Sequence, residues 1–170
     1  MRRTDSDGVR LQMTEIDRAA LEQAVELALL NVDAGGGPFG AVIMRAGRAV
    51  ATGQNRVTRD NDPTAHAEVV AIRSACAALD TFSLAGCTLF TSCEPCPLCL
   101  SAALWARLDR VVFAADRHDA ARAGFDDSAF YEQFARDPGT WTLPSVEAIR
   151  LPGSSAPFDA WLSHPGRTDY

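Results

Sequence analysis

The sequence predicts an α/β layer sandwich, in which helices cover a sheet. Segments with apolar residues at helical spacing alternate with short runs rich in β-branched residues, and glycine or proline clusters separate them. Alternating strands and helices are typical of such layers. The length of 170 residues fits one domain over 13–170 with its own core, preceded by a polar, flexible segment over 1–12.

The first predicted elements are a helix and a hairpin. Thr14 and Asp17 have the spacing of a capping box, and an amphipathic helix extends from them to about Val32. A glycine run then ends the helix. Two β-rich runs over 39–45 and 49–55 are separated by a three-residue turn containing glycine, which predicts a hairpin.

The middle of the chain is predicted to continue the alternation. A polar turn leads into a helix near 64–79, because apolar residues recur there at helical spacing. A strand over 88–92 follows, and Pro97 is well placed as the first residue of a helix that extends to about Arg107. The next apolar run, over 110–115, is predicted to be another strand.

The C-terminal part shows weaker patterns. We expect a helix over 128–136, a strand near 146–151 and a short helix around 157–162.

Charge and composition disfavour several classes of partner. The formal net charge is −6 and the pI is about 5.0, so no global positive field attracts nucleic acid. No apolar run approaches the ~20 residues that span a bilayer, and the first residues lack the apolar region of a secretory signal. We therefore expect a cytoplasmic protein that binds neither nucleic acid nor membrane.

Two segments carry the residues of a hydrolytic zinc site. His66 and Glu68 lie in one, and Cys96 and Cys99 lie in the other, where Pro95 and Pro97 flank Cys96. Zinc favours tetrahedral nitrogen and sulfur ligands, and three protein ligands leave a fourth position for water. The pattern H-x-E…P-C-x-x-C is the known signature of zinc deaminases.

This spacing predicts a division of labour. His66, Cys96 and Cys99 would hold one Zn²⁺, while Glu68 would stay off the metal and carry a proton during hydrolytic deamination. Both segments are predicted at helix beginnings, where the positive end of the helix dipole favours thiolates.

Other interpretations of these residues remain open. A closed structural zinc site would need a fourth ligand, for which Cys93, His118 and His164 are the candidates. A thioredoxin-like redox role would use Cys96 and Cys99 but would leave the histidine and glutamate unexplained.

Beyond these motifs the chain resembles the cytidine-deaminase-like superfamily and, within it, the bacterial guanine deaminases. The resemblance extends over about residues 15–170 and rests on segments 31–43, 54–55, 61–68, 91–99, 105–107, 123–128 and 157–161 and on Tyr170. It implies a three-layer α/β/α fold with a central mixed sheet.

The resemblance also implies roles for residues outside the zinc motif. Asn55 matches an asparagine that hydrogen-bonds the purine ring, and Phe39 and Trp105 match aromatic residues of the base pocket. Asp127 matches an acidic residue that accepts hydrogen bonds from the guanine N1–H and 2-amino group. Asp126 is its nearest competitor, and either residue has an alternative role as a helix cap.

Tyr170 resembles the terminal tyrosine that closes over the base in these enzymes. Their C-terminal segment crosses to a partner subunit, so the resemblance implies a domain-swapped homodimer. The implied function is the zinc-dependent conversion of guanine and water into xanthine and ammonia. The alternatives are a guanosine deaminase, a deaminase of another amino-purine, pterin or triazine, and a zinc-stabilised binding module without catalysis.

Overall fold

The computed structural model describes residues 13–169 and divides the chain into two units. The first unit ends at Asp126 and the second begins at Asp127. The prediction of a flexible segment over 1–12 falls outside the described residues, and so does Tyr170. The prediction of a single domain over 13–170 stays a prediction.

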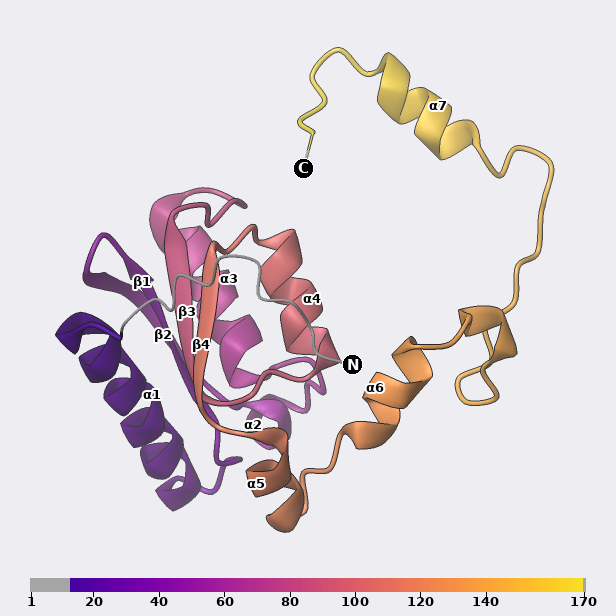
Figure 1. Cartoon of the computed structure of the whole chain (residues 1–170). Coiled ribbons are helices and arrows are strands. Elements are labelled where there is room, and N and C mark those ends of the chain that lie inside the picture. The colour runs from indigo at the N-terminus through magenta and orange to yellow at the C-terminus, as the bar shows by residue number, and fades with distance from the viewer. Residues whose placement is uncertain (1–12, 170) are drawn as a thin grey trace, which may run out of the picture. The chain divides into compact units, whose positions relative to one another are not determined.

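The first unit is built on a mixed four-stranded sheet (Figure 1). Strand β1 (Gly40–Arg45) lies between β2 (Arg48–Gln54) and β3 (Cys87–Cys93) and is antiparallel to both. Strand β4 (Arg110–Ala115) lies at the edge, parallel to β3. The predicted hairpin is confirmed, as are both later strands to within two residues at each end.

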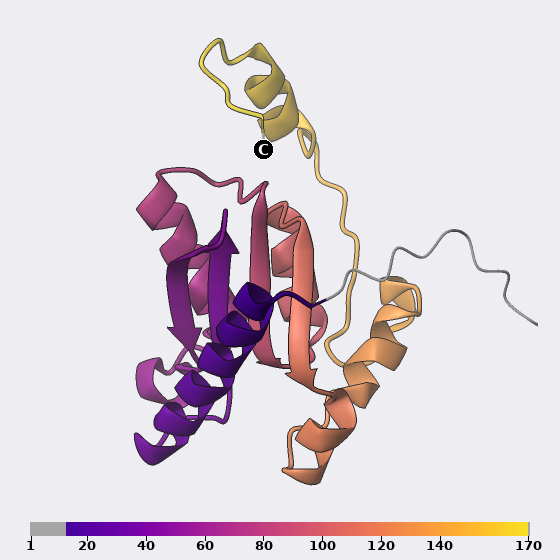
Figure 2. The same ribbon diagram turned by 60° about the vertical axis from the view of Figure 1, so that its left-hand side comes forward.

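Helices cover both faces of this sheet, which gives three layers (Figure 2). Helix α1 (Glu15–Asp33) packs on one face. Helix α3 (Ala67–Leu79) packs on the other, together with α4 (Pro97–Trp105). The predicted capping box at the start of α1 is present. The layers are those that the resemblance implies.

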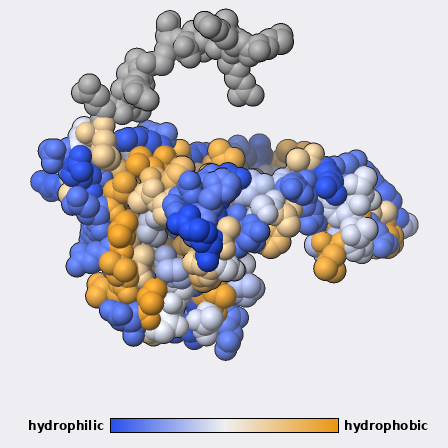
Figure 3. Space-filling view, turned by 60° about the horizontal axis from the view of Figure 1, so that its bottom comes forward, coloured by the Kyte–Doolittle hydropathy of each residue, from blue (hydrophilic) through white to orange (hydrophobic). Residues whose placement is uncertain are grey.

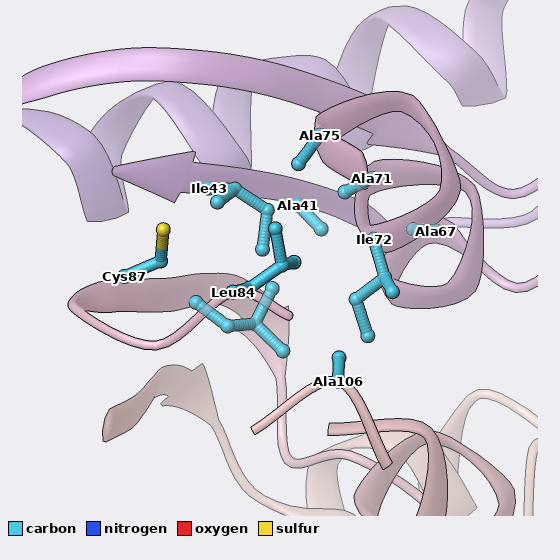
Figure 4. Close-up of a cluster of buried hydrophobic side chains, with 10 residues drawn as sticks. Ala41, Ile43, Ala67, Ala71, Ile72, Ala75, Leu84, Cys87 and Ala106 are labelled. Carbon is cyan, nitrogen blue, oxygen red and sulfur yellow. The ribbon is translucent and has the colours of Figure 1, made fainter. Parts of the chain in front are cut away.

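The core follows from alternation along the strands. Val42 and Phe90 face α1, whereas Ile43 and Leu89 point to the opposite face and pack against α3. Figure 4 shows the cluster on the α3 side of the sheet. Side chains of β1 and α3 converge there on Leu84.

A glycine brings α3 unusually close to the sheet. A Cβ atom at Gly53 would lie 2.1 Å from the carbonyl oxygen of Ala67 and 2.6 Å from the backbone nitrogen of Ala71. Only glycine fits between β2 and the helix at this point. The start of α3, directly after His66, is therefore held against the sheet by backbone packing.

Two short helices of the first unit were not predicted. Helix α2 (Val57–Asp60) is a single turn, and α5 (Arg117–Arg122) begins at a capping box formed by Asp116 and Asp119. Both are too short to show apolar periodicity. Within residues 13–169, no helix is both long and apolar enough to cross a membrane.

The second unit consists of α6 (Ser128–Phe134), a 3₁₀ turn (Pro138–Thr140) and α7 (Ala156–Ser163). Both predicted helices are confirmed. The predicted strand near 146–151 is wrong, since this segment is irregular in the structure. Its β-branched residues pair with no neighbouring strand, and a strand is stable only when another strand satisfies its backbone groups.

Candidate metal centre and active site

The metal-ligand candidates lie at the beginnings of two helices. His66 is the N-cap residue of α3, and Cys96 is the N-cap residue of α4. Pro97 occupies the first turn of α4, where its missing N–H costs no hydrogen bond. Cys99 lies one turn along the helix. The helix predicted near 64–79 begins only at Ala67, so His66 lies directly before it, and the starts of α3 and α4 bring the three candidate ligands together.

The three ligand atoms have the spacing of a tetrahedral zinc site. The Nδ1 atom of His66 lies 3.5 Å from Sγ of Cys96 and 3.4 Å from Sγ of Cys99, and the two sulfur atoms are 3.6 Å apart. Tetrahedral Zn²⁺ with bonds of ~2.3 Å to sulfur and ~2.05 Å to nitrogen separates its ligands by ~3.8 Å and ~3.6 Å respectively. The donor set therefore fits zinc in both chemistry and distance.

The charges of these groups are coupled. The hydrogen bond with Cys99 is the main cause that lowers the pKa of Cys96 to about 4. That same hydrogen bond and burial raise the pKa of Cys99. The hydrogen bond with Cys96 raises the pKa of His66. The thiols and the imidazole thus compete for protons in a small space, which a divalent cation relieves by replacing those protons.

Glu68 is buried in the first turn of α3, with 5% of its surface exposed. Burial is the largest cause that raises the pKa of its carboxyl group, and the charge of Cys96 raises it further. A carboxyl group with a raised pKa accepts a proton more readily than an exposed one and can pass it on. Its burial next to the ligand cluster fits a proton carrier.

The other candidate ligands do not join the cluster. Within residues 13–169, the one group of side chains close enough to share a metal ion is His66, Cys96 and Cys99. Cys93 instead lies with its sulfur atom 3.6 Å from the carbonyl oxygen of Asp116. Neither Cys93 nor His118 supplies a fourth ligand, so the described residues of the first unit do not form a closed structural zinc site, and His164 belongs to the second unit.

Asn55 directly follows β2, and the chain at this point lies beside the segment that carries His66. The N–H of Arg56 donates a hydrogen bond of 2.9 Å to the carbonyl oxygen of Ala65, directly before the histidine. The Asn55 Oδ1 atom accepts a hydrogen bond from the N–H of Val57 at 3.2 Å. This bond orients the side-chain amide, so its NH₂ group remains as a donor within the described part of the chain.

Phe39 is joined to Asn55 and to a second aromatic ring. The carbonyl oxygen of Phe39 accepts a hydrogen bond of 3.1 Å from the N–H of Asn55. Its half-buried ring meets Phe125 edge to face, with centroids 5.0 Å apart. Sequence patterns assigned no role to Phe125, because no periodicity links residues so far apart. The two rings form an aromatic pair, and Phe125 lies near the C-terminal end of the first unit.

Two other predicted site residues, Trp105 and Asp127, are not part of the candidate metal cluster. Trp105 is the last residue of α4, ~9 Å along the helix axis from Cys99, and is 67% exposed. Asp127 precedes α6 and makes no side-chain capping hydrogen bond there. It belongs to the second unit.

Asn31 is a second residue to which sequence patterns assigned no role. It lies on the buried face of α1 with Ala20, Ala24 and Ala28, and none of its surface is exposed. A polar residue that continues the apolar spacing of a helix just before a glycine run is the signal that identifies it.

The chain is similar to known proteins in both sequence and structure. The family model of the cytidine and deoxycytidylate deaminase zinc-binding region matches residues 14–115. Over 151 residues the chain is 50% identical to the guanine deaminase of Bacillus subtilis strain 168, which covers 88% of this chain and 96% of that protein.

Solved structures show the same similarity. The X-ray structure of guanine deaminase from Bacillus subtilis matches with a TM-score of 0.87 and 48% identity, over 90% of this chain and 98% of that chain. The protein NE0047 in complex with 2,6-diaminopurine matches with a TM-score of 0.63 and 36% identity, over 69% of this chain and 65% of that chain.

Proposed function

This chain belongs to the cytidine and deoxycytidylate deaminase family, and from that membership we propose that it is a zinc-dependent guanine deaminase. The reaction converts guanine and water into xanthine and ammonia: a C–O bond forms at C2 and the C2–N bond to the amino group breaks. The observation that carries the reaction type is the tetrahedral spacing of His66, Cys96 and Cys99 beside the buried Glu68.

His66, Cys96 and Cys99 are the residues that would hold zinc. When bound, zinc supplies the activation of a water molecule, because it lowers the pKa of that water to about 7. Glu68 takes a proton from water and delivers protons to a ring nitrogen and to the departing ammonia. Its burial supports this role, because burial raises the pKa of the carboxyl group and so helps it to hold a proton between the two transfers.

The choice of guanine is supported by the 50% identity to a guanine deaminase over nearly the whole length of both proteins. Asn55 would donate from its NH₂ group to an acceptor on the purine ring. Asp127 would accept hydrogen bonds from N1–H and the 2-amino group, donors that adenine lacks on that edge. Phe39 would pack its aromatic ring against the base. Trp105 and Tyr170 keep the pocket roles that the resemblance implies.

The experiment that tests this function is an ammonia-release assay on zinc-loaded protein with guanine, guanosine, adenine, cytosine and cytidine. We expect release from guanine. Faster turnover of guanosine would instead identify the nucleoside enzyme, and release from adenine or a pyrimidine alone would reject the proposal.

A zinc-stabilised binding module is the alternative outside enzymology, and chelation separates the two. The cores on both faces of the sheet consist of apolar residues of α1, α3 and the strands rather than of the metal ligands. We therefore expect metal-free protein to keep its circular dichroism spectrum while losing turnover. Unfolding on chelation would support a structural zinc domain.

The oligomer that fits this site is a domain-swapped homodimer. In the second unit no residue over 127–169 is buried, and many large apolar side chains are exposed: Phe130, Phe134, Leu143, Val146, Ile149, Leu151, Phe158, Trp161 and Leu162. Figure 3 shows from one side that hydrophobic residues lie at the molecular surface. A segment without a buried core of its own needs a partner surface, and a second copy provides one.

Truncation tests the swapped tail. We expect a chain that ends before Trp161 to lose turnover and to dimerise more weakly, as measured by light scattering coupled to size-exclusion chromatography. A truncated chain that remains a fully active dimer would remove Tyr170 from the site. A cytoplasmic location completes the proposal and is supported by the five cysteines, which form no disulfide among residues 13–169, as is typical of reducing compartments.

A further inference from the structure

Asn31 is a buried polar residue whose side-chain NH₂ group donates both of its hydrogen bonds to the segments that carry the substrate-binding candidates Phe39 and Asn55. Its Nδ2 atom donates one hydrogen bond of 2.8 Å to the carbonyl oxygen of Gly37 and another of 2.8 Å to that of Asn55. Its Oδ1 atom accepts one of 3.3 Å from Arg59. Both amide hydrogens and the oxygen are thus satisfied, which fixes the orientation of this side chain.

The glycine turn after α1 packs closely against the side-chain amide of Asn31. The N–H of Gly36 donates to the backbone oxygen of Asn31 at 2.7 Å, and a Cβ atom at Gly36 would lie 2.5 Å from Asn31 Nδ2. At Gly37, a Cβ atom would lie 3.2 Å from Cγ of Asn55. The turn therefore packs between the two asparagine side chains, with no room for a larger residue at Gly36.

The same bonds connect the two substrate-binding candidates to each other. The carbonyl oxygen of Gly37, which Asn31 binds, also accepts a hydrogen bond of 2.8 Å from the N–H of Phe39. The N–H of Asn55 closes the network by donating to Phe39 at 3.1 Å. Asn31 thus lies at the centre of a hydrogen-bonded network that includes the backbone of both residues.

From this network we propose that Asn31 is a positioning residue for substrate binding, which sets the place of the Asn55 amide and of the Phe39 ring. The inference rests on the proposed function. None of the side-chain hydrogen bonds of Asn31 involves His66, Cys96 or Cys99, so we expect its replacement to affect binding of the base more than binding of zinc. Small displacements of such groups weaken binding because hydrogen bonds require precise distances and angles.

Asn31→Asp tests the proposal with nearly unchanged side-chain volume. A carboxylate places an acceptor against two carbonyl oxygens, so the donors to Gly37 and Asn55 are lost. We expect KM for guanine to rise about tenfold, kcat to change less than about threefold, and zinc content to stay unchanged. A folded Asn31→Asp protein with the KM of the parent chain would overturn the proposal.

Gln54→Leu is the matched control. The Gln54 Nε2 atom donates a hydrogen bond of 2.8 Å to the carbonyl oxygen of Leu27, so it also joins β2 to α1 but lies outside the network. We expect its loss to lower the unfolding temperature without changing KM. An equal rise of KM in both variants would show that Asn31 acts only through stability.

A double-mutant cycle tests whether Asn31 acts through Asn55. We expect Asn31→Asp to lower kcat/KM about tenfold in the parent chain but at most about threefold when Asn55 is already alanine. A tenfold loss in both backgrounds would contradict the proposal. If Asn31→Asp fails to fold, Gly36→Ala displaces the same amide without altering it and is expected to raise KM in the same way.

Hydrogen exchange separates this inference from the proposed function. In Asn31→Asp we expect the backbone N–H groups of Phe39 and Asn55 to exchange at least about tenfold faster by NMR, with no such change in Gln54→Leu. Unchanged exchange would overturn the positioning role. If the parent chain releases no ammonia from guanine, the proposed function fails, while the exchange rates still decide the role of Asn31.

Discussion

Glu94 and Arg117 form an ion pair that ties the turn before Cys96 to the first residue of α5. The carboxylate accepts hydrogen bonds from the Arg117 backbone N–H at 3.0 Å and from its Nε at 3.1 Å. The turn after β3 leads to the candidate zinc ligand Cys96 and is thus attached to α5, which precedes Phe125 of the Phe39–Phe125 pair.

Glu94→Gln should weaken this attachment. The hydrogen bond from Arg117 holds the pKa of Glu94 below its ordinary value of 4.5. The carboxylate therefore stabilises the fold above pH 4.5, and this contribution disappears as the pH falls through the lower, folded-state pKa. We expect a loss of about 1 kcal/mol in unfolding free energy at pH 7, and a smaller difference below pH 4, measured by urea denaturation of metal-free protein.

Arg122→Ala provides the control for that prediction. It removes the more exposed pair between Arg122 and Asp119 in the same helix, and solvent screens an exposed pair of this kind, so we expect a smaller loss of stability than for Glu94→Gln. An equal destabilisation by both variants would show that the Glu94 pair has no special role.

Glu68→Gln should abolish turnover without removing zinc. Glutamine has nearly the same volume as the buried glutamate but cannot carry a proton, so we expect kcat to fall at least about 100-fold. Zinc content by atomic absorption and the unfolding temperature should stay close to the values of the parent chain. Substantial residual ammonia release from a zinc-loaded variant would refute the proton-carrier role.

Gly53→Ala should damage both fold and site. The added methyl group would meet the backbone of α3 at 2.1 Å, and backbone cannot move aside as a flexible side chain can. We expect a loss of about 3 kcal/mol or more in unfolding free energy, together with weaker zinc retention, because His66 directly precedes α3. Gly139→Ala, whose new atom would meet its nearest neighbour at an ordinary 3.4 Å, should be close to neutral.

The sequence predicted those parts of the fold whose signals are local. The capping box at Thr14, the hairpin and Pro97 at the start of α4 each follow from a few neighbouring residues, and each is present in the structure. The strand predicted near 146–151 failed because pairing depends on a neighbouring strand, which composition does not reveal.

For the candidate site, too, the sequence predicted what depends on local spacing and missed the contacts between distant residues. The spacing of His66, Cys96 and Cys99 in the sequence identified a cluster that the structure assembles. The contact of Phe39 with Phe125 and the bond from Asn31 to Asn55 join residues distant in sequence, so only the folded chain reveals them.

A mixture of two inactive variants tests whether the swapped tail completes each site. In the proposed dimer, Glu68 of one subunit and Asp127 of the other belong to the same active site. A heterodimer of Glu68→Gln and Asp127→Ala chains then contains one site with both residues intact and one site with neither. When the two proteins are unfolded together and refolded at equal concentrations, half of the dimers are mixed, so about a quarter of the parent activity should return. Each variant refolded alone controls for residual turnover. If each site is instead built within one chain, every site of the mixed dimer lacks one residue, and the mixture stays as inactive as its components.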